Sequence, residues 1–165
     1  MIRRMTDNDI VAVREVALAS WKETYASLFP VEVQEDWFER TYSAAMLSKQ
    51  LEKTLMYVIE DQQIVCGFVS FTKVDEDGDS ELTALYIMPS KMNLGFGTKL
   101  VAHGLEELRA TGEQLHVYVE STNEIARAFY EKIGFQLVDE FEEYFEGHQV
   151  TTAQYQYPLK TPTFS

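Results

Sequence analysis

Cysteine, basic residues and long apolar runs are scarce in this sequence of 165 residues. Cys66 is the only cysteine, which excludes an internal disulfide framework and makes a reducing cytoplasm the expected compartment. No apolar run approaches the roughly 20 residues that a membrane helix needs, and the first residues lack the apolar core of a signal peptide. Internal repeats and flexible linkers are missing as well. We therefore expect a single domain over residues 1–165 with no membrane partner.

The sequence also contains few basic residues. Fourteen lysines and arginines face 27 acidic residues, which gives a net charge of -13. A nucleic-acid partner is disfavoured, because phosphate binding needs clustered basic side chains. An acidic surface attracts a cationic substrate, but it also simply keeps a protein soluble, and both interpretations stay open here.

The apolar residues that are present recur with the periods of strands and helices in turn. Thr6, followed three residues later by Asp9, predicts the start of the first helix. Gly112 and Gly134 predict the ends of the last two helices. The expected strands are residues 2–5, 55–60, 64–73, 81–88, 115–120, 135–141 and 149–157, and the expected helices are residues 10–19, 31–41, 44–53, 95–110 and 123–133. This order predicts an α/β domain with a strand–helix–strand unit in its middle.

The stretch NLGFGTKL at residues 93–100 stands between an expected strand and an expected helix. It fits neither a nucleotide-binding P-loop, whose glycines lie further apart, nor a dinucleotide fingerprint, whose third glycine position is Leu100. Two glycines still allow close approach to the main chain, and helix-start N–H groups bind phosphate. The stretch is therefore either a tight turn or a cradle for a phosphorylated cofactor.

The acidic run DEDGDS at residues 75–80 raises the question of calcium. An EF-hand loop needs glycine at its sixth position and glutamate at its twelfth. Counted from Asp75, glycine comes fourth and Tyr86 stands twelfth. We therefore expect a hydrated turn and no metal.

Two longer segments carry a resemblance to a known family. LTALYIMPSKMNLGFGTKL and VYVESTNEIARAFYEKIGF, from Leu82 to Phe135, resemble the GNAT superfamily of N-acetyltransferases. The first is similar to that family's strand and acetyl-CoA loop, and the second to its next strand, Asn, helix and Tyr. One departure is Met92, where the family usually has Gln or Arg. The resemblance implies an α/β single-domain GNAT fold, in which helices flank a mixed, mostly antiparallel sheet.

The same resemblance implies where acetyl-CoA would bind. Main-chain groups of Leu85, Tyr86 and Ile87 would pair with the pantetheine arm. The pyrophosphate would lie against Asn93, Leu94, Gly95, Phe96, Gly97 and Thr98. Asn123 would bind the pantetheine or a water near the sulfur, and Lys132 would reach the phosphates, unless it only faces solvent.

Two residues are the candidates for proton transfer. Tyr130 matches the family's tyrosine and would be the general acid, with a packed core aromatic as the alternative. Glu81 would be the general base on its strand, with an exposed acid at a strand start as the alternative. Glu120, Tyr118 and a chain of waters are rivals for the base.

The acceptor side is less defined by the sequence. Aromatic residues of the first helices could line an acceptor pocket, but packing of these helices onto the sheet is the favoured interpretation. The aromatic residues are Trp21, Tyr25, Phe29, Trp37 and Phe38. The implied activity is acetyl transfer from acetyl-CoA to a primary amine. The acid-rich DEFEEYFE at residues 139–146 favours a polyamine or another small amine, and a peptide amine is also compatible. The alternatives are a non-catalytic acyl-CoA-binding regulator, which Met92 favours, and a domain with a vestigial site. The final strands, where relatives often make dimer contacts, make a homodimer an option.

Overall fold

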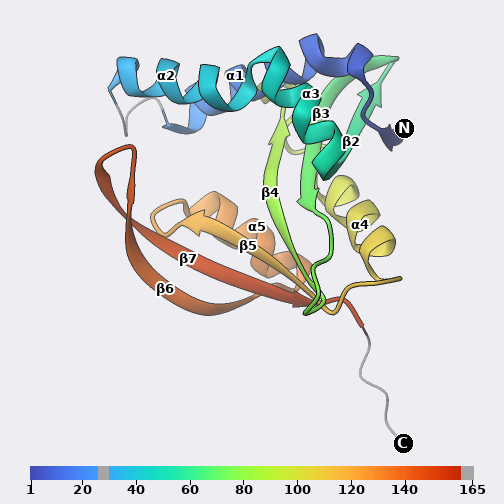
Figure 1. Ribbon diagram of the computed structural model, residues 1–165, viewed down its shortest axis with the longest axis vertical. Coiled ribbons are helices and arrows are strands. Elements are labelled where there is room, and N and C mark those ends of the chain that lie inside the picture. The colour runs from blue at the N-terminus through green and yellow to red at the C-terminus, as the bar shows by residue number, and fades with distance from the viewer. Residues whose placement is uncertain (26–29, 161–165) are drawn as a thin grey trace, which may run out of the picture. The chain divides into compact units, whose positions relative to one another are not determined.

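The computed structural model describes residues 1–25 and 30–160. In this part of the chain, seven strands form a sheet in the order β1-β2-β3-β4-β5-β7-β6 (Figure 1). The strands are β1 (Ile2–Arg4), β2 (Thr54–Asp61), β3 (Ile64–Thr72), β4 (Asp79–Ile87), β5 (Gln114–Glu120), β6 (Gln136–Phe145) and β7 (His148–Pro158). The α-helices are α1 (Ile10–Tyr25), α2 (Val31–Tyr42), α3 (Ala44–Lys53), α4 (Phe96–Leu108) and α5 (Glu124–Ile133), and the short 3-10 helices are η1 (Asp7–Asp9) and η2 (Pro89–Lys91).

Contacts within the chain define two compact units. The first contains Met1–Phe71 and Ala84–Gly104, and the second contains Thr72–Thr83 and Leu105–Ser165. Strand β4 contributes residues to both. A single domain over residues 1–165 stays a prediction.

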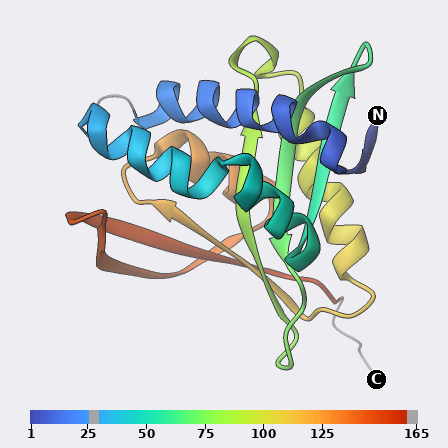
Figure 2. The same ribbon diagram turned by 45° about the horizontal axis from the view of Figure 1, so that its top comes forward.

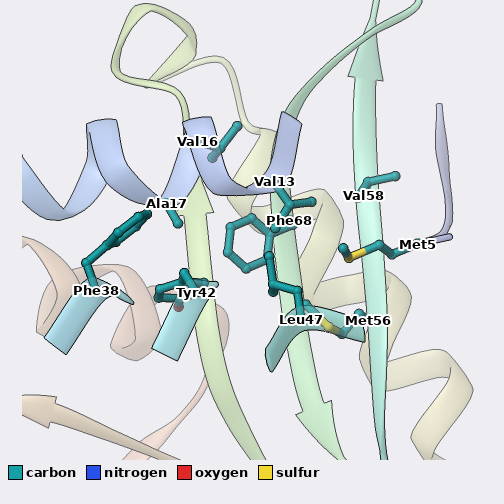
Figure 3. Packing of buried hydrophobic residues seen from close by; sticks show 10 residues of the cluster. All are labelled: Met5, Val13, Val16, Ala17, Phe38, Tyr42, Leu47, Met56, Val58 and Phe68. Atoms are coloured by element: carbon teal, nitrogen blue, oxygen red, sulfur yellow. The ribbon is translucent and has the colours of Figure 1, made fainter. Parts of the chain in front are cut away.

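In the first unit, α1, α2 and α3 cover one face of β2 and β3 (Figures 1 and 2). Because side chains alternate along a strand, Met56 and Val58 of β2 join the core below these helices. Figure 3 shows ten members of this core: Met5, Val13, Val16, Ala17, Phe38, Tyr42, Leu47, Met56, Val58 and Phe68. Tyr57 points the other way and meets His103 of α4, with ring centroids 4.7 Å apart.

Helix α4 packs closely against β3 on that opposite face. A Cβ atom on Gly104 would lie 2.1 Å from Cζ of Phe71, so a side chain at this position would force the helix away from the strand. Glycine in mid-helix usually lowers stability, and here it is required by the close approach of the Phe71 ring. The contact fixes α4, and with it the loop that precedes α4.

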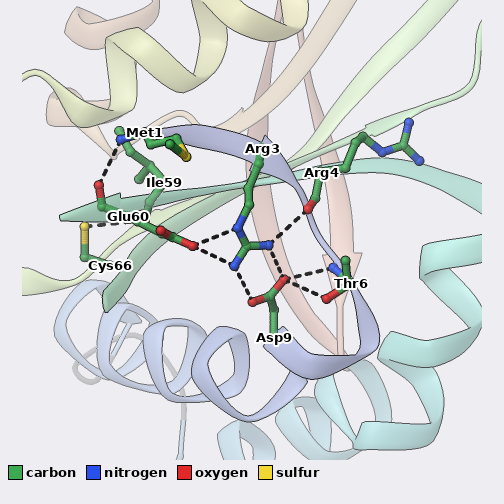
Figure 4. Close-up of polar contacts among 8 residues, drawn as sticks. All are labelled: Met1, Arg3, Arg4, Thr6, Asp9, Ile59, Glu60 and Cys66. Carbon is green, nitrogen blue, oxygen red and sulfur yellow. Dashed lines mark hydrogen bonds and ion pairs between the residues drawn. The ribbon is translucent and has the colours of Figure 1, made fainter. Parts of the chain in front are cut away.

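An ion-pair network ties the N-terminal strand to the first helical turn (Figure 4). The Arg3 guanidinium donates to both carboxylate oxygens of Asp9, at 2.7 and 2.8 Å, and to Oε1 of Glu60 at 2.7 Å. Asp9 also accepts the Thr6 N–H at 2.9 Å, as the predicted helix start requires. The hydrogen bond from Arg3 holds the pKa of the buried Asp9 carboxyl below its usual value.

The second unit is built on β5, β6 and β7. The first residues of β4, up to Thr83, belong to this unit and pair in parallel with β5. Strands β5 and β6 both pair antiparallel with β7. Helix α5 covers one face, where Phe135 meets Tyr157 at a ring-centroid distance of 5.2 Å. The other face of the strands carries polar side chains, among them His116 and Gln154.

The predicted α/β architecture, with a mixed and mostly antiparallel sheet, is confirmed. The ends of β4 and β6 differ from the expected ones because pairing with neighbouring strands lengthens both strands. Strand β4 begins at Asp79 because Asp79 pairs with Gln114, and β6 continues to Phe145 because Phe145 pairs with His148. Within the described ranges, no helix has both the length and the apolar character needed to cross a membrane.

Candidate active site

The loop before α4 has the backbone of an anion-binding turn. Asn93 and Gly95 both adopt left-handed conformations, with φ of 65° and 82°. Gly95 accepts the first helical hydrogen bond, from the N–H of Lys99 at 3.1 Å. The N–H groups of the first turn have no partner within a helix, and the helix dipole adds partial positive charge there. Successive main-chain N–H groups in such turns form a concave site for anions, so the loop fits a phosphate group.

The side chains around this loop are mostly exposed, as a phosphate site at the protein surface requires. Met92, Asn93, Leu94 and Thr98 are exposed, and Phe96 and Gly97 are half-buried. The Lys99 ammonium lies 5.8 Å from the centre of the Phe96 ring, on the first turn of α4. Lys99 was not among the residues predicted to bind the cofactor.

The predicted pantetheine strand, Leu85–Ile87, lies at the end of β4 in the first unit. All three residues are half-buried. The Ile87 carbonyl accepts a hydrogen bond from the Ser20 hydroxyl at 2.9 Å, and the Tyr86 ring packs 5.6 Å from that of Phe68. The strand end is therefore held in place by α1 and by the core beneath the first helices.

The second unit contains an open cleft of about 430 Å³. Its lining residues are Thr72, Asp75, Asp79, Ser80, Glu81, His116 and Tyr118. Glu81 lies half-buried in it, directly across the β4–β5 pair from His116. Burial raises the pKa of the Glu81 carboxyl, and the positive charge of protonated His116 opposes that shift. A carboxyl of this kind can take up a proton near neutral pH more readily than an exposed one.

His116 is held in one orientation beside Glu81. Its Nδ1 lies 3.3 Å from the Gln154 side-chain amide, and its Nε2 lies 3.0 Å from Oδ1 of Asp79. His116 was not among the residues predicted for the site. The alternation of His116, Tyr118 and Glu120 along β5 was the available signal, because residues two apart share one face of a strand.

The two rival bases lie on the same strand face. Burial, and then the charges of nearby carboxylates, raises the pKa of Tyr118. Burial and the charge of Glu143 raise the pKa of the Glu120 carboxyl. The geometry thus brings Glu81, Tyr118 and Glu120 onto one acidic face of the second unit.

Helix α5 carries the other predicted site residues. Asn123 is its N-cap, and its side-chain oxygen accepts the Ala126 N–H at 3.0 Å. Lys132 is exposed in the last turn. Tyr130 is only 6% exposed, and its ring packs edge-on against Phe129 and Phe135 at 5.1 and 5.3 Å. Tyr130 is therefore a packed aromatic residue, and any proton transfer would come from a hydroxyl in a largely dry environment.

A polar network fastens α5 to the strands beneath it. The Arg127 guanidinium donates to the Tyr155 hydroxyl at 2.9 Å, to the Ser121 carbonyl at 3.1 Å and to Glu140 at 2.9 Å. The buried Tyr155 hydroxyl in turn donates to Glu131 at 2.6 Å. These bonds fix the turn between β5 and α5, where Asn123 lies.

The aromatic residues of the first helices follow the packing interpretation. Trp21 and Phe38 are buried, and Trp21 stacks on Trp37 with ring centroids 3.9 Å apart. The Tyr25 side chain and Phe29 lie outside the described part of the chain.

The acidic turn forms the expected connection between β3 and β4. Asp75 accepts the N–H groups of Asp77 and Asp79, each at 2.9 Å, which closes the turn. The three carboxylates lie within 4.8 Å of one another, and two of them are exposed.

Residues 15–135 match the model of the Acetyltransferase (GNAT) family. A spermidine N(1)-acetyltransferase from Thermoplasma acidophilum is 26% identical over 146 residues, which cover 84% of this chain and 89% of that protein. An uncharacterised N-acetyltransferase of Bacillus subtilis, YuaI, is 28% identical over 127 residues, or 74% of this chain and 72% of that protein.

A solved structure has the same fold. The crystal structure of the PaiA N-acetyltransferase from Thermoplasma acidophilum in complex with coenzyme A matches with a TM-score of 0.81 and 24% identity. The match covers 95% of this chain and 98% of that one.

Proposed function

Because the chain belongs to the GNAT family of acetyl-CoA-dependent N-acetyltransferases, we propose that it acetylates a primary amine of a small polyamine. The observation that carries this proposal is Glu81, a half-buried carboxyl in a cleft whose other lining includes Asp75 and Asp79. Such a cleft favours a cationic acceptor by electrostatic attraction. The Thermoplasma relative is named for spermidine, which supports the same class of acceptor.

Glu81 and Tyr130 divide the proton transfers between them in this proposal. An alkylammonium has a pKa near ~10.4, so the reacting amine must lose a proton before it can attack. Glu81 takes that proton, and the raised pKa of its carboxyl suits this role. The amine nitrogen bonds to the acetyl carbon while the carbon–sulfur bond breaks, and the Tyr130 hydroxyl gives a proton to the departing sulfur. The nitrogen then loses its second proton, which restores the Tyr130 hydroxyl and leaves a neutral amide.

Acetyl-CoA supplies the activated acetyl group, and the residues predicted to hold it are compatible with the local geometry. The left-handed turn at Asn93 and Gly95 and the start of α4 suit the pyrophosphate, through main-chain groups of residues 93–98. Leu85–Ile87 remain the proposed partners of the pantetheine arm. Asn123 and Lys132 remain proposed ligands, with the Asn123 side-chain oxygen already engaged as the cap of α5.

Thiol release from acetyl-CoA tests the activity directly. The acceptors are spermidine, spermine, amino acids, aminoglycosides and short peptides, each assayed with the wild type and with Glu81→Gln. We expect turnover on a polyamine and a loss of about 100-fold in kcat with Glu81→Gln, a typical effect of removing a general base. The matched control is Glu76→Gln, which removes the same charge from the exposed turn outside the cleft lining and should retain full activity. Equal activity of all three proteins on a polyamine would exclude Glu81 as the base.

A second candidate function rests on Met92, which stands exposed where relatives usually have Gln or Arg. It is a non-catalytic protein that binds acyl-CoA for regulation. This function predicts that acetyl-CoA raises the melting temperature while no amine in the panel is acetylated.

We also keep two further predictions about the whole protein. β6 lies at the end of the strand order and is mostly exposed, so a homodimer would use this edge. Light scattering after size-exclusion chromatography measures the oligomeric state.

The cytoplasm is the predicted location, and Cys66, a buried free thiol, is compatible with a reducing compartment.

A further inference from the structure

Two aromatic rings lie next to each other on the acidic face of the second unit. Tyr118 of β5 and Phe141 of β6 meet edge to face, with ring centroids 6.3 Å apart and an interplanar angle of 69°. Strand β7 lies between their strands, where Tyr118 pairs with Gln154 and Phe141 with Thr152. Since these partners are two residues apart on β7, both rings stand on the same face of the sheet.

Carboxylates flank this aromatic pair on both sides. Glu81 and Asp79 come from β4, and Glu143 comes from β6, two residues beyond Phe141. All three act electrostatically on the Tyr118 hydroxyl, whose pKa they raise after the larger effect of burial. Neither Lys nor Arg is among the described residues that line the cleft. The rings therefore lie among carboxylates, and His116 is the one basic side chain among the described lining residues.

Tyr118 is open to a ligand. It is 42% exposed and lines the cleft that contains Glu81. A half-exposed aromatic ring among carboxylates is the usual setting in which a protein binds an ammonium group, because the ring face and the carboxylates both attract positive charge. The carboxylates would repel an anionic ligand, and a neutral ligand would gain only contact with the rings.

We propose that Tyr118 and Phe141 form a subsite for a second, protonated ammonium group of the acceptor, so that the enzyme selects diamines and polyamines over monoamines. The inference rests on the proposed function and adds to it the residues that decide specificity. The amine that reacts near Glu81 must be neutral, whereas the distal amine keeps its proton and its charge. The two ends of one acceptor therefore need different surroundings.

The spacing agrees with a short diamine. Tyr118 lies one strand away from Glu81 and two residues beyond its partner His116. Strand spacing and rise place the backbones of Glu81 and Tyr118 about 8 Å apart. Side chains that lean toward each other can shorten this distance to the span of a three- or four-carbon spacer.

The test compares 1,4-diaminobutane with butylamine, which has the same carbon chain but lacks the distal ammonium. Values of kcat/KM are measured for the wild type, Tyr118→Phe, Tyr118→Leu and Phe141→Leu. The matched control is Tyr144→Leu, a tyrosine of β6 that is 74% exposed and pairs with Gln149, away from the cleft. Melting temperatures of all variants check that each one folds.

We expect the wild type to prefer the diamine. Tyr118→Leu and Phe141→Leu should lower kcat/KM for the diamine about tenfold while the monoamine changes less than twofold. Tyr118→Phe retains the ring and should retain the preference, as should the Tyr144→Leu control. The preference should also weaken as salt is added, because the attraction is partly electrostatic.

Three results would overturn the subsite. The first is a wild type that acetylates both amines with equal kcat/KM. The second is an equal loss on both amines in Tyr118→Leu. The third is a loss in Tyr118→Phe as large as that in Tyr118→Leu, which would assign the effect to the hydroxyl. A wild type that acetylates no amine at all would overturn the proposed function and the subsite together, and this outcome is distinct from the other three.

Discussion

Glu81 and His116 lie directly opposite each other across the parallel β4–β5 pair. The protonated imidazole lowers the pKa of a carboxyl that burial has raised. His116 itself is oriented by Asp79 on β4 and by Gln154 on β7. The proton affinity of the proposed base is therefore raised by burial and moderated by a residue that lies on the next strand.

Replacing His116 should shift the pH dependence of the reaction. His116→Gln removes the positive charge that favours the Glu81 carboxylate, so the pKa of Glu81 rises. Because the base must be ionised to accept a proton, the acidic limb of the kcat/KM profile should move to higher pH. Asp79 and Tyr118 also face this group, and neither supplies a compensating positive charge. A profile of kcat/KM recorded from pH 5 to pH 9 for both proteins measures the shift. An unchanged acidic limb would show that His116 does not influence the pKa of the base.

Removing the Tyr130 hydroxyl should lower kcat without unfolding the protein. Tyr130→Phe keeps the ring that packs between Phe129 and Phe135, so the melting temperature should change little. Loss of a general acid should reduce kcat at least tenfold. Tyr157→Phe is the matched control, since it removes a hydroxyl from the same aromatic cluster and should leave kcat unchanged. Full activity in Tyr130→Phe would identify Tyr130 as a core aromatic residue only.

The turn before α4 offers a test of cofactor binding with a close control. Gly95 and Gly147 both have φ of 82°, and a Cβ atom on either one would meet nothing within 4 Å. Alanine at each should cost about 1–2 kcal/mol of stability through backbone strain alone. Only Gly95→Ala should weaken coenzyme A binding, by about tenfold, if the strain also disturbs the N–H groups that hold the phosphates. Calorimetric titration measures both variants, and equal affinities would place the phosphates elsewhere.

The ion pair between Arg3 and Asp9 predicts a pH-dependent stability. Hydrogen bonding to Arg3 lowers the pKa of Asp9 in the folded state below its ordinary value of 3.8. The stabilisation is therefore present above that value and is lost as the pH falls through the lowered pKa. Asp9→Asn should reduce the free energy of unfolding by about 2 kcal/mol at pH 7, and the difference should shrink below pH 3.8.

Urea unfolding of the wild type and Asp9→Asn at a series of pH values measures this difference. The control is Asp7→Asn, an exposed acid in the same 3-10 helix, which should change stability little at any pH. A deficit in Asp9→Asn that is the same at pH 3 and pH 7 would contradict the ion-pair explanation.

Local patterns in the sequence were sufficient to predict most of the fold. The period of apolar residues located the strands and helices, and Gly134 ended α5 as predicted, with φ of 124°. The loop at Asn93–Gly95 was also predictable, because glycine next to a helix start indicates a special backbone. These features depend on residues that are neighbours in the chain.

The parts that could not be predicted depend on register between distant strands. Nothing local to His116 indicates that Glu81 pairs with it, since the two are brought together only by the β4–β5 pairing. The bond between Arg127 and Tyr155 likewise joins residues 28 positions apart. The burial of Tyr130 depends on how Phe135 folds back against α5, so a family motif alone could not distinguish a packed ring from an accessible one.

The central claim, acetylation of a polyamine by this chain, is tested most directly by the mass of the product. The protein is incubated with acetyl-CoA and spermidine, and the amine is analysed by mass spectrometry, with Glu81→Gln and Glu76→Gln in parallel. The account predicts spermidine heavier by one acetyl group in the wild type and in Glu76→Gln, and about 100-fold slower formation of this product in Glu81→Gln. Unmodified spermidine after incubation with the wild type, under conditions where acetyl-CoA binding is measured by calorimetry, would contradict it.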